Sequence, residues 1–271
     1  MYTIFGSTGF IGREIIKFLK KKNIKIYTPK RNQIKFNKNL GNIIYCIGSD
    51  NWKENIKDGF YSNLGHLQKI LFNSKYKSFL FLSSSRVYIH QNSKTNEEEY
   101  IKIKSDDLND FYNLLKLTSE SLCLSLNNKK IKVIRLSNVL GNNYSSPLVL
   151  PTLIRNGIQR GKIKLFINKN STKDYIGIDD VTQLIFKIIN RGKERIYNVA
   201  SGKNTKLIEI VKIIRNETNC RITLINQKEK ILEPIINISR IKKEFKFNPK
   251  INFKSDLKKT INNFKIFLKK Y

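Results

Sequence analysis

Short apolar runs alternate with helical patterns over the first two-thirds of the 271-residue chain. Short runs rich in Ile, Phe and Tyr predict strands, and longer segments with apolar residues at helical spacing predict helices. The predicted strands are Tyr2–Phe5, Lys25–Tyr27, Ile43–Ile47, Ser78–Leu82 and Lys132–Leu136. The predicted helices between them are Ile11–Lys22, Tyr61–Asn73 and Asp110–Asn127. This alternation predicts right-handed βαβ units and a parallel sheet.

The pattern becomes less regular after about residue 142. Amphipathic segments near Leu150–Gln159, Asp180–Asn190, Leu207–Glu217 and Asp256–Leu268 predict further helices. We expect these helices to build a smaller second lobe. Residues 1–170 would then form mainly the sheet domain and residues 171–271 mainly the small lobe, with segments exchanged between the two.

The segment Gly6-Ser7-Thr8-Gly9-Phe10-Ile11-Gly12 joins the first predicted strand to the first predicted helix. Its glycines would permit a tight turn, a close approach of the backbone to a pyrophosphate and close packing of helix on strand. The helix N-terminus would add unpaired N–H groups and a positive dipole end. We therefore predict a dinucleotide-binding turn in an α/β fold of Rossmann type. Such a fold is a doubly wound parallel sheet, here with a smaller C-terminal substrate-binding lobe.

The end of the second strand bears on which dinucleotide binds. An acid there would hydrogen-bond the ribose 2′-hydroxyl of NAD, whereas a base would accommodate the 2′-phosphate of NADP. The segment Ile24–Arg31 contains no acid, and it ends in Lys30 and Arg31. This composition favours NADP(H), with NAD(H) as the alternative.

Composition narrows the range of partners. Lys and Arg total 52 against 21 acids, which gives a formal net charge of +31. The lysines are spread along the chain, so we expect no nucleic acid and no membrane as partner; the positive field would attract an anionic small substrate. No uncharged apolar run reaches the roughly 18 residues of a membrane span. Cys46, Cys123 and Cys220 are isolated, which indicates reduced thiols in a cytoplasmic protein.

The strand Ser78–Leu82 runs into the hydroxyl residues Ser83, Ser84 and Ser85. In a parallel sheet, ligands bind beyond the carboxyl ends of the strands, so these serines would meet a ligand. Tyr112 and Lys116 stand four positions apart in a predicted helix and therefore share one face. The ammonium would lower the pKa of the phenol, and Tyr112 would exchange a proton with a substrate oxygen. A serine hydroxyl would hydrogen-bond the same oxygen.

With these motifs the sequence resembles the extended short-chain dehydrogenase/reductase family, in particular its NAD-dependent epimerase/dehydratase group, which acts on nucleotide-activated sugars. The match runs over almost the whole chain. Besides the motifs above, the segments that resemble the family are Asn63-Leu64-Gly65-His66, Arg135-Leu136-Ser137-Asn138-Val139-Leu140-Gly141, Lys173-Asp174-Tyr175-Ile176, Tyr197-Asn198-Val199-Ala200-Ser201-Gly202, and Ser239-Arg240 with Phe247-Asn248-Pro249.

The resemblance implies roles for individual residues. Tyr112 would be the catalytic acid/base, Lys116 would hold the cofactor ribose, and Ser84, with Ser85 as the runner-up, would orient the substrate oxygen. The implied cofactor-binding residues are Gly6, Thr8, Gly9, Phe10, Ile11, Gly12, Lys30, Arg31, Ile47, Gly48, Asn63, Leu82, Tyr112 and Lys116. The implied substrate-binding residues are Ser84, Ser85, Arg86, Asn138 and Lys173. Asn138 would contact the sugar or its phosphate, and Lys173 would approach the diphosphate.

One departure from the family narrows the reaction. Sugar dehydratases of the family have Thr-Asp-Glu where this chain has Ser84-Ser85-Arg86, so the acids that eliminate water are missing. We therefore favour NADPH-dependent reduction of a keto group on a nucleotide diphosphate sugar, such as a 4-keto-6-deoxy sugar. The alternatives are a nucleotide-sugar 4-epimerase that holds NAD tightly and a non-catalytic Rossmann binding protein.

The remaining candidates receive structural assignments. His66 and His90 lack metal-ligand spacing to Cys or acid clusters, so no metal site is predicted. His66 is expected to pack near the helix beneath the cofactor, and His90 to be a solvated loop residue or a substrate contact. Trp52 is assigned to loop packing and Glu97–Glu99 to a solvated face. By the family resemblance, helices 61–73 and 110–127 would form a homodimer interface; the alternative is that both are covered within a monomer.

Overall fold

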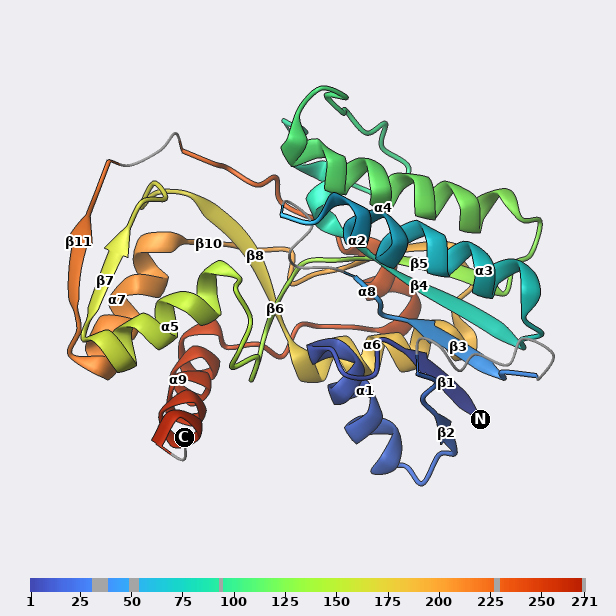
Figure 1. Ribbon diagram of the computed structural model, residues 1–271, viewed down its shortest axis with the longest axis horizontal. Helices are drawn as coiled ribbons and strands as arrows, with labels where there is room; N and C mark the ends of the chain where they lie inside the picture. The colour runs from blue at the N-terminus through green and yellow to red at the C-terminus, as the bar shows by residue number, and fades with distance from the viewer. Residues whose placement is uncertain (31–38, 49–53, 93–94, 227–229, 270–271) are drawn as a thin grey trace.

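The computed structural model describes residues 1–30, 39–48, 54–92, 95–226 and 230–269. The chain forms two lobes that lie side by side (Figure 1). The larger lobe is built on a parallel sheet with helices on both faces. The smaller lobe combines short sheets with helices from the second half of the chain and contains the C-terminal helix.

The central sheet consists of six parallel strands in the order β2-β1-β3-β4-β5-β9. The strands are β1 (Tyr2–Phe5), β2 (Ile26–Tyr27), β3 (Asn42–Tyr45), β4 (Ser78–Ser84), β5 (Ile131–Leu136) and β9 (Ile196–Val199). The first five coincide with the predicted strands to within two residues at each end. A strand order that steps outward from β1 in both directions is that of a doubly wound sheet. The predicted Rossmann-type fold is confirmed.

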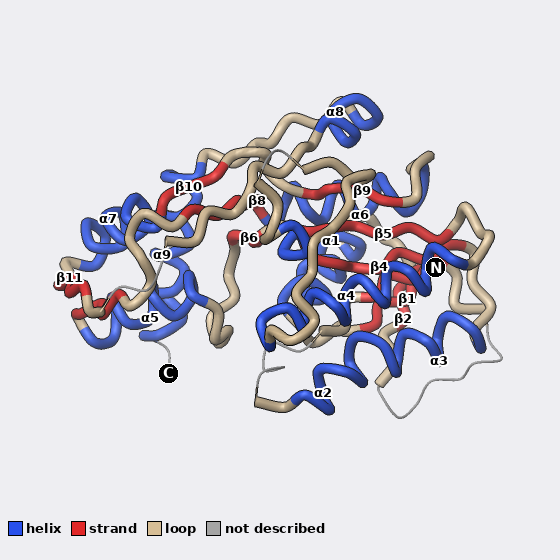
Figure 2. Tube along the Cα trace, turned by 90° about the horizontal axis from the view of Figure 1, so that it is seen from above, coloured by secondary structure: helices blue, strands red, loops and turns tan. Residues whose placement is uncertain are grey.

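Helices from distant parts of the chain cover the two faces of this sheet (Figure 2). On one face, α1 (Phe10–Lys20) packs with α6 (Ile178–Arg191) around Ile15, Leu184 and Ile185. On the other, α3 (His66–Asn73) and α4 (Leu108–Ser125) pack around Leu67 and Cys123. We expected α6 to join the small lobe; its apolar face is instead buried on the central sheet.

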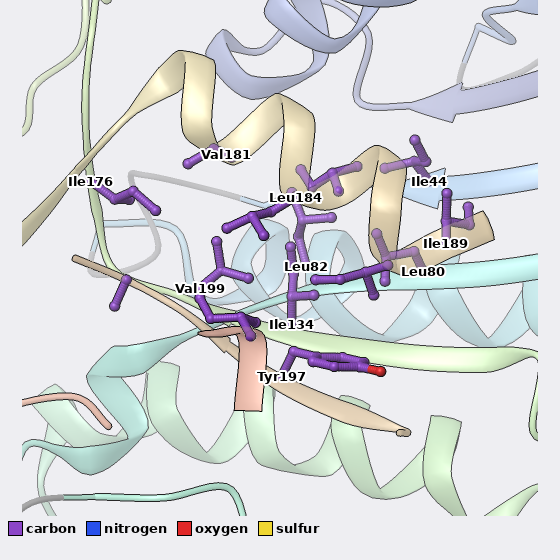
Figure 3. Close-up of a cluster of buried hydrophobic side chains, with 14 of the residues drawn as sticks. Ile44, Leu80, Leu82, Ile134, Ile176, Val181, Leu184, Ile189, Tyr197 and Val199 are labelled. Atoms are coloured by element: carbon purple, nitrogen blue, oxygen red, sulfur yellow. The ribbon is translucent and has the colours of Figure 1, made fainter. Parts of the chain in front are cut away.

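The strand β4 shows why the central strands read as unbroken apolar runs. Phe79 and Phe81 pack in the cluster beneath α3 and α4, whereas Leu80 and Leu82 pack in the cluster beneath α1 and α6. Successive side chains point to opposite faces, so a strand covered on both faces needs apolar residues throughout. Figure 3 shows Leu80 and Leu82 beside Leu184 of α6.

The predicted helix Tyr61–Asn73 is longer than expected and irregular. It starts with α2 (Ile56–Phe60), passes through a π-helical turn (Tyr61–Gly65) and continues as α3. Asn55 caps its N-terminus by accepting a hydrogen bond from the Asp58 main-chain N–H at 2.9 Å. Single π turns inside helices occur frequently at functional sites. This turn contains Asn63, one of the predicted cofactor-binding residues.

The small lobe has a three-stranded sheet, β10-β8-β6, and a two-stranded sheet, β11-β7. Its strands are β6 (Asn138–Leu140), β7 (Lys162–Leu165), β8 (Thr172–Gly177), β10 (Asn204–Lys206) and β11 (Arg221–Leu224). Three helices enclose an apolar core with them: α5 (Val149–Arg160), α7 (Leu207–Thr218) and α9 (Phe253–Lys269). These helices were predicted from the sequence. The strands of this lobe and α8 (Ser239–Phe245) were not predicted.

Further predictions concern membrane spans, the state of the cysteines, metal binding and dimerisation. No helix in the described ranges combines the length and apolarity needed to cross a bilayer. In the same ranges the three cysteines are free thiols, and no cluster of His, Cys, Asp and Glu could hold a metal ion. Leu64, Phe72, Leu117 and Leu122 help to line a groove between α3 and α4. The homodimer through these helices stays a prediction.

Replacing Ile134 with Ala tests the core beneath α6. Ile134 is fully buried at 0% exposure, so Ile134→Ala should lower the free energy of unfolding by about 2–5 kcal/mol. Ile266, on α9, is 58% exposed, and Ile266→Ala should change it by less than about 0.5 kcal/mol. Urea denaturation measures both values. Equal losses from the two variants would show that the core is placed wrongly.

Candidate active site

The glycine turn after β1 has no room for side chains. Gly6 has a φ of +83°, in the left-handed region, and a Cβ there would lie 2.8 Å from the carbonyl carbon of Cys46. A Cβ on Gly12 would lie 2.2 Å from the main-chain oxygen of Gly6. The turn is closed by a hydrogen bond from the Gly9 N–H to the Gly6 oxygen at 3.1 Å. The first and third glycines therefore serve the tight turn and the close helix–strand packing that the sequence predicted.

The N-terminus of α1 fits an anionic ligand. Gly9 is its N-cap residue, no side chain caps it, and its first turn contains no acid. Its first N–H groups thus lack intrahelical partners and lie at the positive end of the helix dipole, where a pyrophosphate would bind. Thr8 and Gly9 are exposed at the turn. Phe10 extends towards Gly141, where a Cβ would lie 2.7 Å from the Phe10 ring, and Ile11 packs against the core.

The Lys116 side chain crosses from α4 to the carboxyl ends of β3 and β4. Lys116 is only 4% exposed, and its ammonium donates a hydrogen bond to the Leu82 main-chain oxygen at 3.1 Å. A Cβ on Gly48, which follows β3 and Ile47, would lie 3.9 Å from the same Nζ. The ammonium also lies 5.7 Å from the centre of the Tyr112 ring. Tyr112, Lys116, Leu82 and Gly48 thus lie close together, and their roles in cofactor binding stay predictions.

The serine segment continues this edge of the sheet. Ser84 ends β4, and its Oγ accepts a hydrogen bond from the Arg86 N–H at 3.2 Å, which caps a 3-10 turn (Ser85–Tyr88). Ser84 is half-buried, and Ser85 is 9% exposed. The choice between Ser84 and Ser85 as the catalytic serine stays open. The guanidinium of Arg86 reaches α4, where Nη2 donates to the Asn109 main-chain oxygen at 3.3 Å.

A buried carboxylate holds the start of the helix that carries Tyr112. Asp110 is 1% exposed and accepts hydrogen bonds from His90 Nε2 and the Lys104 N–H, both at 2.8 Å, and from Asn113 Nδ2 at 2.7 Å. Burial raises the pKa of Asp110, but these hydrogen bonds outweigh it and leave the pKa below its ordinary value. His90 is 40% exposed in a turn, as predicted for a solvated loop residue, and its ring is also bonded to Asp110. The only sign of this buried acid in the sequence was its position, two residues before Tyr112.

A second buried carboxylate lies one turn beyond Lys116 on the same face of α4. Glu120 is 2% exposed, pairs with Arg135 of β5 at 2.7 Å and accepts a hydrogen bond from the Ser83 hydroxyl. Arg135 Nη1 in turn donates to the Tyr88 hydroxyl at 2.6 Å. This network was not predicted, although the spacing of Tyr112, Lys116 and Glu120 by four residues indicates a shared helix face.

The burial of Glu97 contradicts the prediction of a solvated face. The acids Glu97–Glu99 were assigned to a solvated face, but Glu97 is only 7% exposed. Its Oε1 accepts a hydrogen bond from the Asn198 N–H on β9 at 2.8 Å, and its Oε2 lies 3.8 Å from Arg240 Nε. Glu98 also pairs with Arg240. Within this run of acids, Glu97 is buried and paired with partners more than 100 positions away.

Asn63 carries an unsatisfied polar atom at the π turn. It is fully buried, and its Nδ2 donates to the Gly59 main-chain oxygen at 2.8 Å. Its Oδ1 has no hydrogen-bond partner among the described residues. Its main-chain oxygen accepts a hydrogen bond from Ser119 Oγ of α4 at 3.0 Å. A buried acceptor without a donor is rare in native proteins, which agrees with a ligand-binding role for Asn63.

Two of the remaining predicted residues have partners in the segments 138–233. Asn138, on β6, donates to the Asp174 main-chain oxygen at 3.0 Å, and Lys173, on β8, pairs with Glu233 at 2.9 Å. Lys30 is exposed beyond β2. Arg31 and Trp52 lie outside the described residues.

Replacing Gly12 with Ala tests the dinucleotide turn. The added methyl group would overlap the Gly6 oxygen, so the turn would have to open and Gly12→Ala should weaken NAD(H) and NADP(H) binding at least about 10-fold. Gly177→Ala is the control, because a Cβ there meets only Ile251, at 4.0 Å. Fluorescence titration with the reduced cofactors measures both. Unchanged affinity in Gly12→Ala would contradict the assignment.

Comparison with known proteins agrees with this geometry at the level of the fold. No curated protein sequence matches the chain significantly. A UDP-glucose 4-epimerase from Thermotoga maritima, solved with UDP-glucose, superposes with a TM-score of 0.83 at 16% identity, covering 98% of this chain and 99% of that one. RMD from Pseudomonas aeruginosa, complexed with NADPH, gives 0.76 at 17% identity, covering 98% of each chain.

A third solved structure shares the fold, and the sequence itself identifies the family. A dTDP-glucose 4,6-dehydratase from Bacillus anthracis, in complex with NAD, superposes with a TM-score of 0.76 at 16% identity, covering 96% of this chain and 95% of that one. The sequence model of the NAD dependent epimerase/dehydratase family matches residues 43–200, which is more than half of the chain. The chain therefore belongs to the NAD dependent epimerase/dehydratase family of enzymes.

Proposed function

We propose that this enzyme transfers a hydride between a nicotinamide cofactor and the sugar of a nucleotide diphosphate sugar. The observation that carries the proposal is the buried Lys116 ammonium between the Leu82 carbonyl and the Tyr112 ring. It lies at the carboxyl ends of β3 and β4, where ligands of doubly wound sheets bind. The solved structures of this fold with UDP-glucose and with NADPH support the same ligand classes.

The proposed mechanism assigns proton transfer, phenolate stabilisation and substrate positioning to separate residues. The cofactor, when bound, supplies or accepts the hydride at the sugar carbon. Tyr112 gives a proton from its hydroxyl to the sugar oxygen during reduction and takes it back during oxidation. The Lys116 ammonium stabilises the Tyr112 phenolate and holds the cofactor ribose. Ser84, or its neighbour Ser85, donates a hydrogen bond to the same sugar oxygen and fixes its position.

Cofactor and substrate contacts follow from the same arrangement. The turn Gly6–Gly12 and the N-terminus of α1 hold the cofactor pyrophosphate, and Asn63 contacts the cofactor from the π turn. Asn138 and Lys173 approach the substrate diphosphate from β6 and β8. Because Lys173 is paired with Glu233 at 2.9 Å, binding a diphosphate requires it to exchange or share that partner.

Reduction of a keto group is the first candidate reaction. Lys30 lies exposed beyond β2 and is followed by Arg31, so this end of the sheet suits the 2′-phosphate of NADP(H). In the reaction the carbonyl carbon gains the hydride and its oxygen gains the Tyr112 proton, so that the keto group becomes a hydroxyl. A nucleotide-linked 4-keto-6-deoxy sugar is a substrate of this kind.

Epimerisation at C4 is the second candidate, and the fold match to a UDP-glucose 4-epimerase supports it. It needs the same proton carrier twice. Tyr112 takes the hydroxyl proton as the sugar is oxidised and returns it as the sugar is reduced on its other face. The reaction has no net redox change, so the enzyme would keep NAD bound between turnovers.

Cofactor identity distinguishes the two candidates. We expect the purified protein to be free of bound nucleotide and to bind NADPH at least about 10-fold more tightly than NADH in separate fluorescence titrations, because two basic residues follow β2. NAD released from the protein in a one-to-one ratio would favour the epimerase instead. Binding of neither cofactor would overturn the enzymatic proposal.

Removing one hydroxyl tests the proton carrier. Tyr112→Phe should lower turnover about 100- to 10,000-fold and leave cofactor affinity within about twofold, since the ring and Lys116 remain. Tyr100→Phe removes the same group from a side chain that is 95% exposed and should turn over normally. The assay is NADPH oxidation with nucleotide-linked 4-keto-6-deoxy sugars, alongside interconversion of UDP-glucose and UDP-galactose. Near-normal turnover in Tyr112→Phe would rule out the assigned role.

A further inference from the structure

Arg86 bridges the two segments that carry the proposed catalytic residues. It follows Ser84 by two positions in the 3-10 turn after β4, and its N–H donates to Ser84 Oγ at 3.2 Å. Its guanidinium donates through Nη2 to the Asn109 main-chain oxygen at 3.3 Å, in the first turn of α4. Tyr112 lies less than one helical turn further along. The cation is therefore held beside the strand end with Ser84 and beside the helix start with Tyr112.

The guanidinium of Arg86 is only partly satisfied. Its Nε is buried and has no hydrogen-bond partner among the described residues. Guanidinium presents five N–H donors in a rigid fork, and a single long hydrogen bond to a carbonyl oxygen uses little of that capacity. A buried donor without an acceptor destabilises the folded state, and such groups in native proteins require an explanation. Because Arg86 lies at a strand end, where ligands of such sheets bind, a ligand could supply the acceptor for its Nε.

The buried carboxylates near Arg86 are occupied by other partners. Asp110 accepts hydrogen bonds from His90, Lys104 and Asn113. Glu120 is paired with Arg135. In the ranges that the structure describes, no ion pair joins a carboxylate to Arg86, whereas these acids keep their own donors. Among the described residues, the positive charge of Arg86 is thus left without an anionic side chain.

We propose that Arg86 binds a carboxylate on the sugar ring of the substrate, so that the enzyme selects nucleotide-linked sugar acids over neutral sugars. The inference rests on the proposed function, which places the sugar between Ser84 and Tyr112. A carboxylate offers two oxygens that match the guanidinium fork, and such charge-assisted pairs are stronger than bonds to neutral hydroxyls. The substrate diphosphate is assigned to Asn138 and Lys173 on the small lobe, so it does not compete for Arg86.

A carboxylate contact at Arg86 would restrict the sugar of the substrate to sugar acids. A hexuronic acid carries a carboxylate on the carbon where a 6-deoxy sugar has a methyl group. A methyl group would leave the Arg86 cation desolvated and unpaired, at a cost in binding free energy. Sugar acids therefore take precedence over 6-deoxy sugars as substrates for either candidate reaction.

The test compares matched ligands on the full-length, cofactor-loaded protein by calorimetry. The pairs are UDP-glucuronic acid with UDP-glucose, and GDP-mannuronic acid with GDP-mannose. For at least one pair, the wild-type protein should bind the acid about 10- to 100-fold more tightly than the neutral sugar, as expected for one charge-assisted hydrogen-bonded pair. In Arg86→Gln the preference should fall below about threefold, mainly through a loss of affinity for the acid.

Two further variants separate recognition from net charge. Arg160→Gln removes the same charge from an exposed position on α5 and should keep the full preference. Arg86→Lys keeps the charge but loses the fork, so it should retain only part of the preference. Equal binding of acid and neutral sugar by the wild type, or a preference that survives in Arg86→Gln, overturns this inference alone. Failure of every nucleotide sugar to bind overturns the proposed function together with it.

Discussion

The candidate active site depends on one buried charge, the ammonium of Lys116. Removing an ammonium from water costs several kcal/mol, so its surroundings must compensate closely. The compensation comes from the Leu82 carbonyl at 3.1 Å and from the faces of Phe81 and Tyr112, whose ring centres lie 5.1 and 5.7 Å away. These partners belong to β4 and to α4, so the charge is tolerated only while strand and helix keep their relative position. The same requirement places Tyr112 beside the strand end that carries Ser84.

The buried network one turn further along α4 keeps that position. Glu120 binds Arg135 of β5 at 2.7 Å and also accepts a hydrogen bond from Ser83, the residue before Ser84. Helix α4 is thereby tied to the two central strands just beyond Lys116. Breaking a buried pair of this kind leaves an uncompensated charge, which costs about 3–5 kcal/mol, so small shifts of α4 are opposed strongly. Catalytic geometry and fold stability are therefore linked through the same helix face.

The sequence predicts those parts of this arrangement that depend on local pattern. The central strands read as apolar runs because helices cover both faces, and the glycine turn and the Tyr112–Lys116 spacing are local motifs. Burial of Glu97 was not predictable, because its partner Asn198 lies 101 positions away and the two acids that follow it suggested a solvated face. The bonds of Asp110 to His90 were missed for the same reason, since a loop returns to the helix. Local periodicity carries no information on such contacts.

The distribution of acids explains which chemistry the site supports. With 21 acids against 52 bases, carboxylates are scarce, and those buried near the site are committed to structural bonds. At the strand end and the start of α4, the groups that the proposed function assigns to cofactor or substrate are hydroxyls and cations: Ser84, Tyr112, Lys116 and Arg86. By the family resemblance, dehydratases carry an acid where this chain has Arg86, and a cation there cannot accept a proton. Proton exchange at a phenol has no such need, because in the proposed mechanism the nearby Lys116 ammonium would stabilise the phenolate. We infer that the shortage of free carboxylates at this site disfavours dehydration and favours hydride transfer. Under the same proposal, the Arg86 cation selects the sugar.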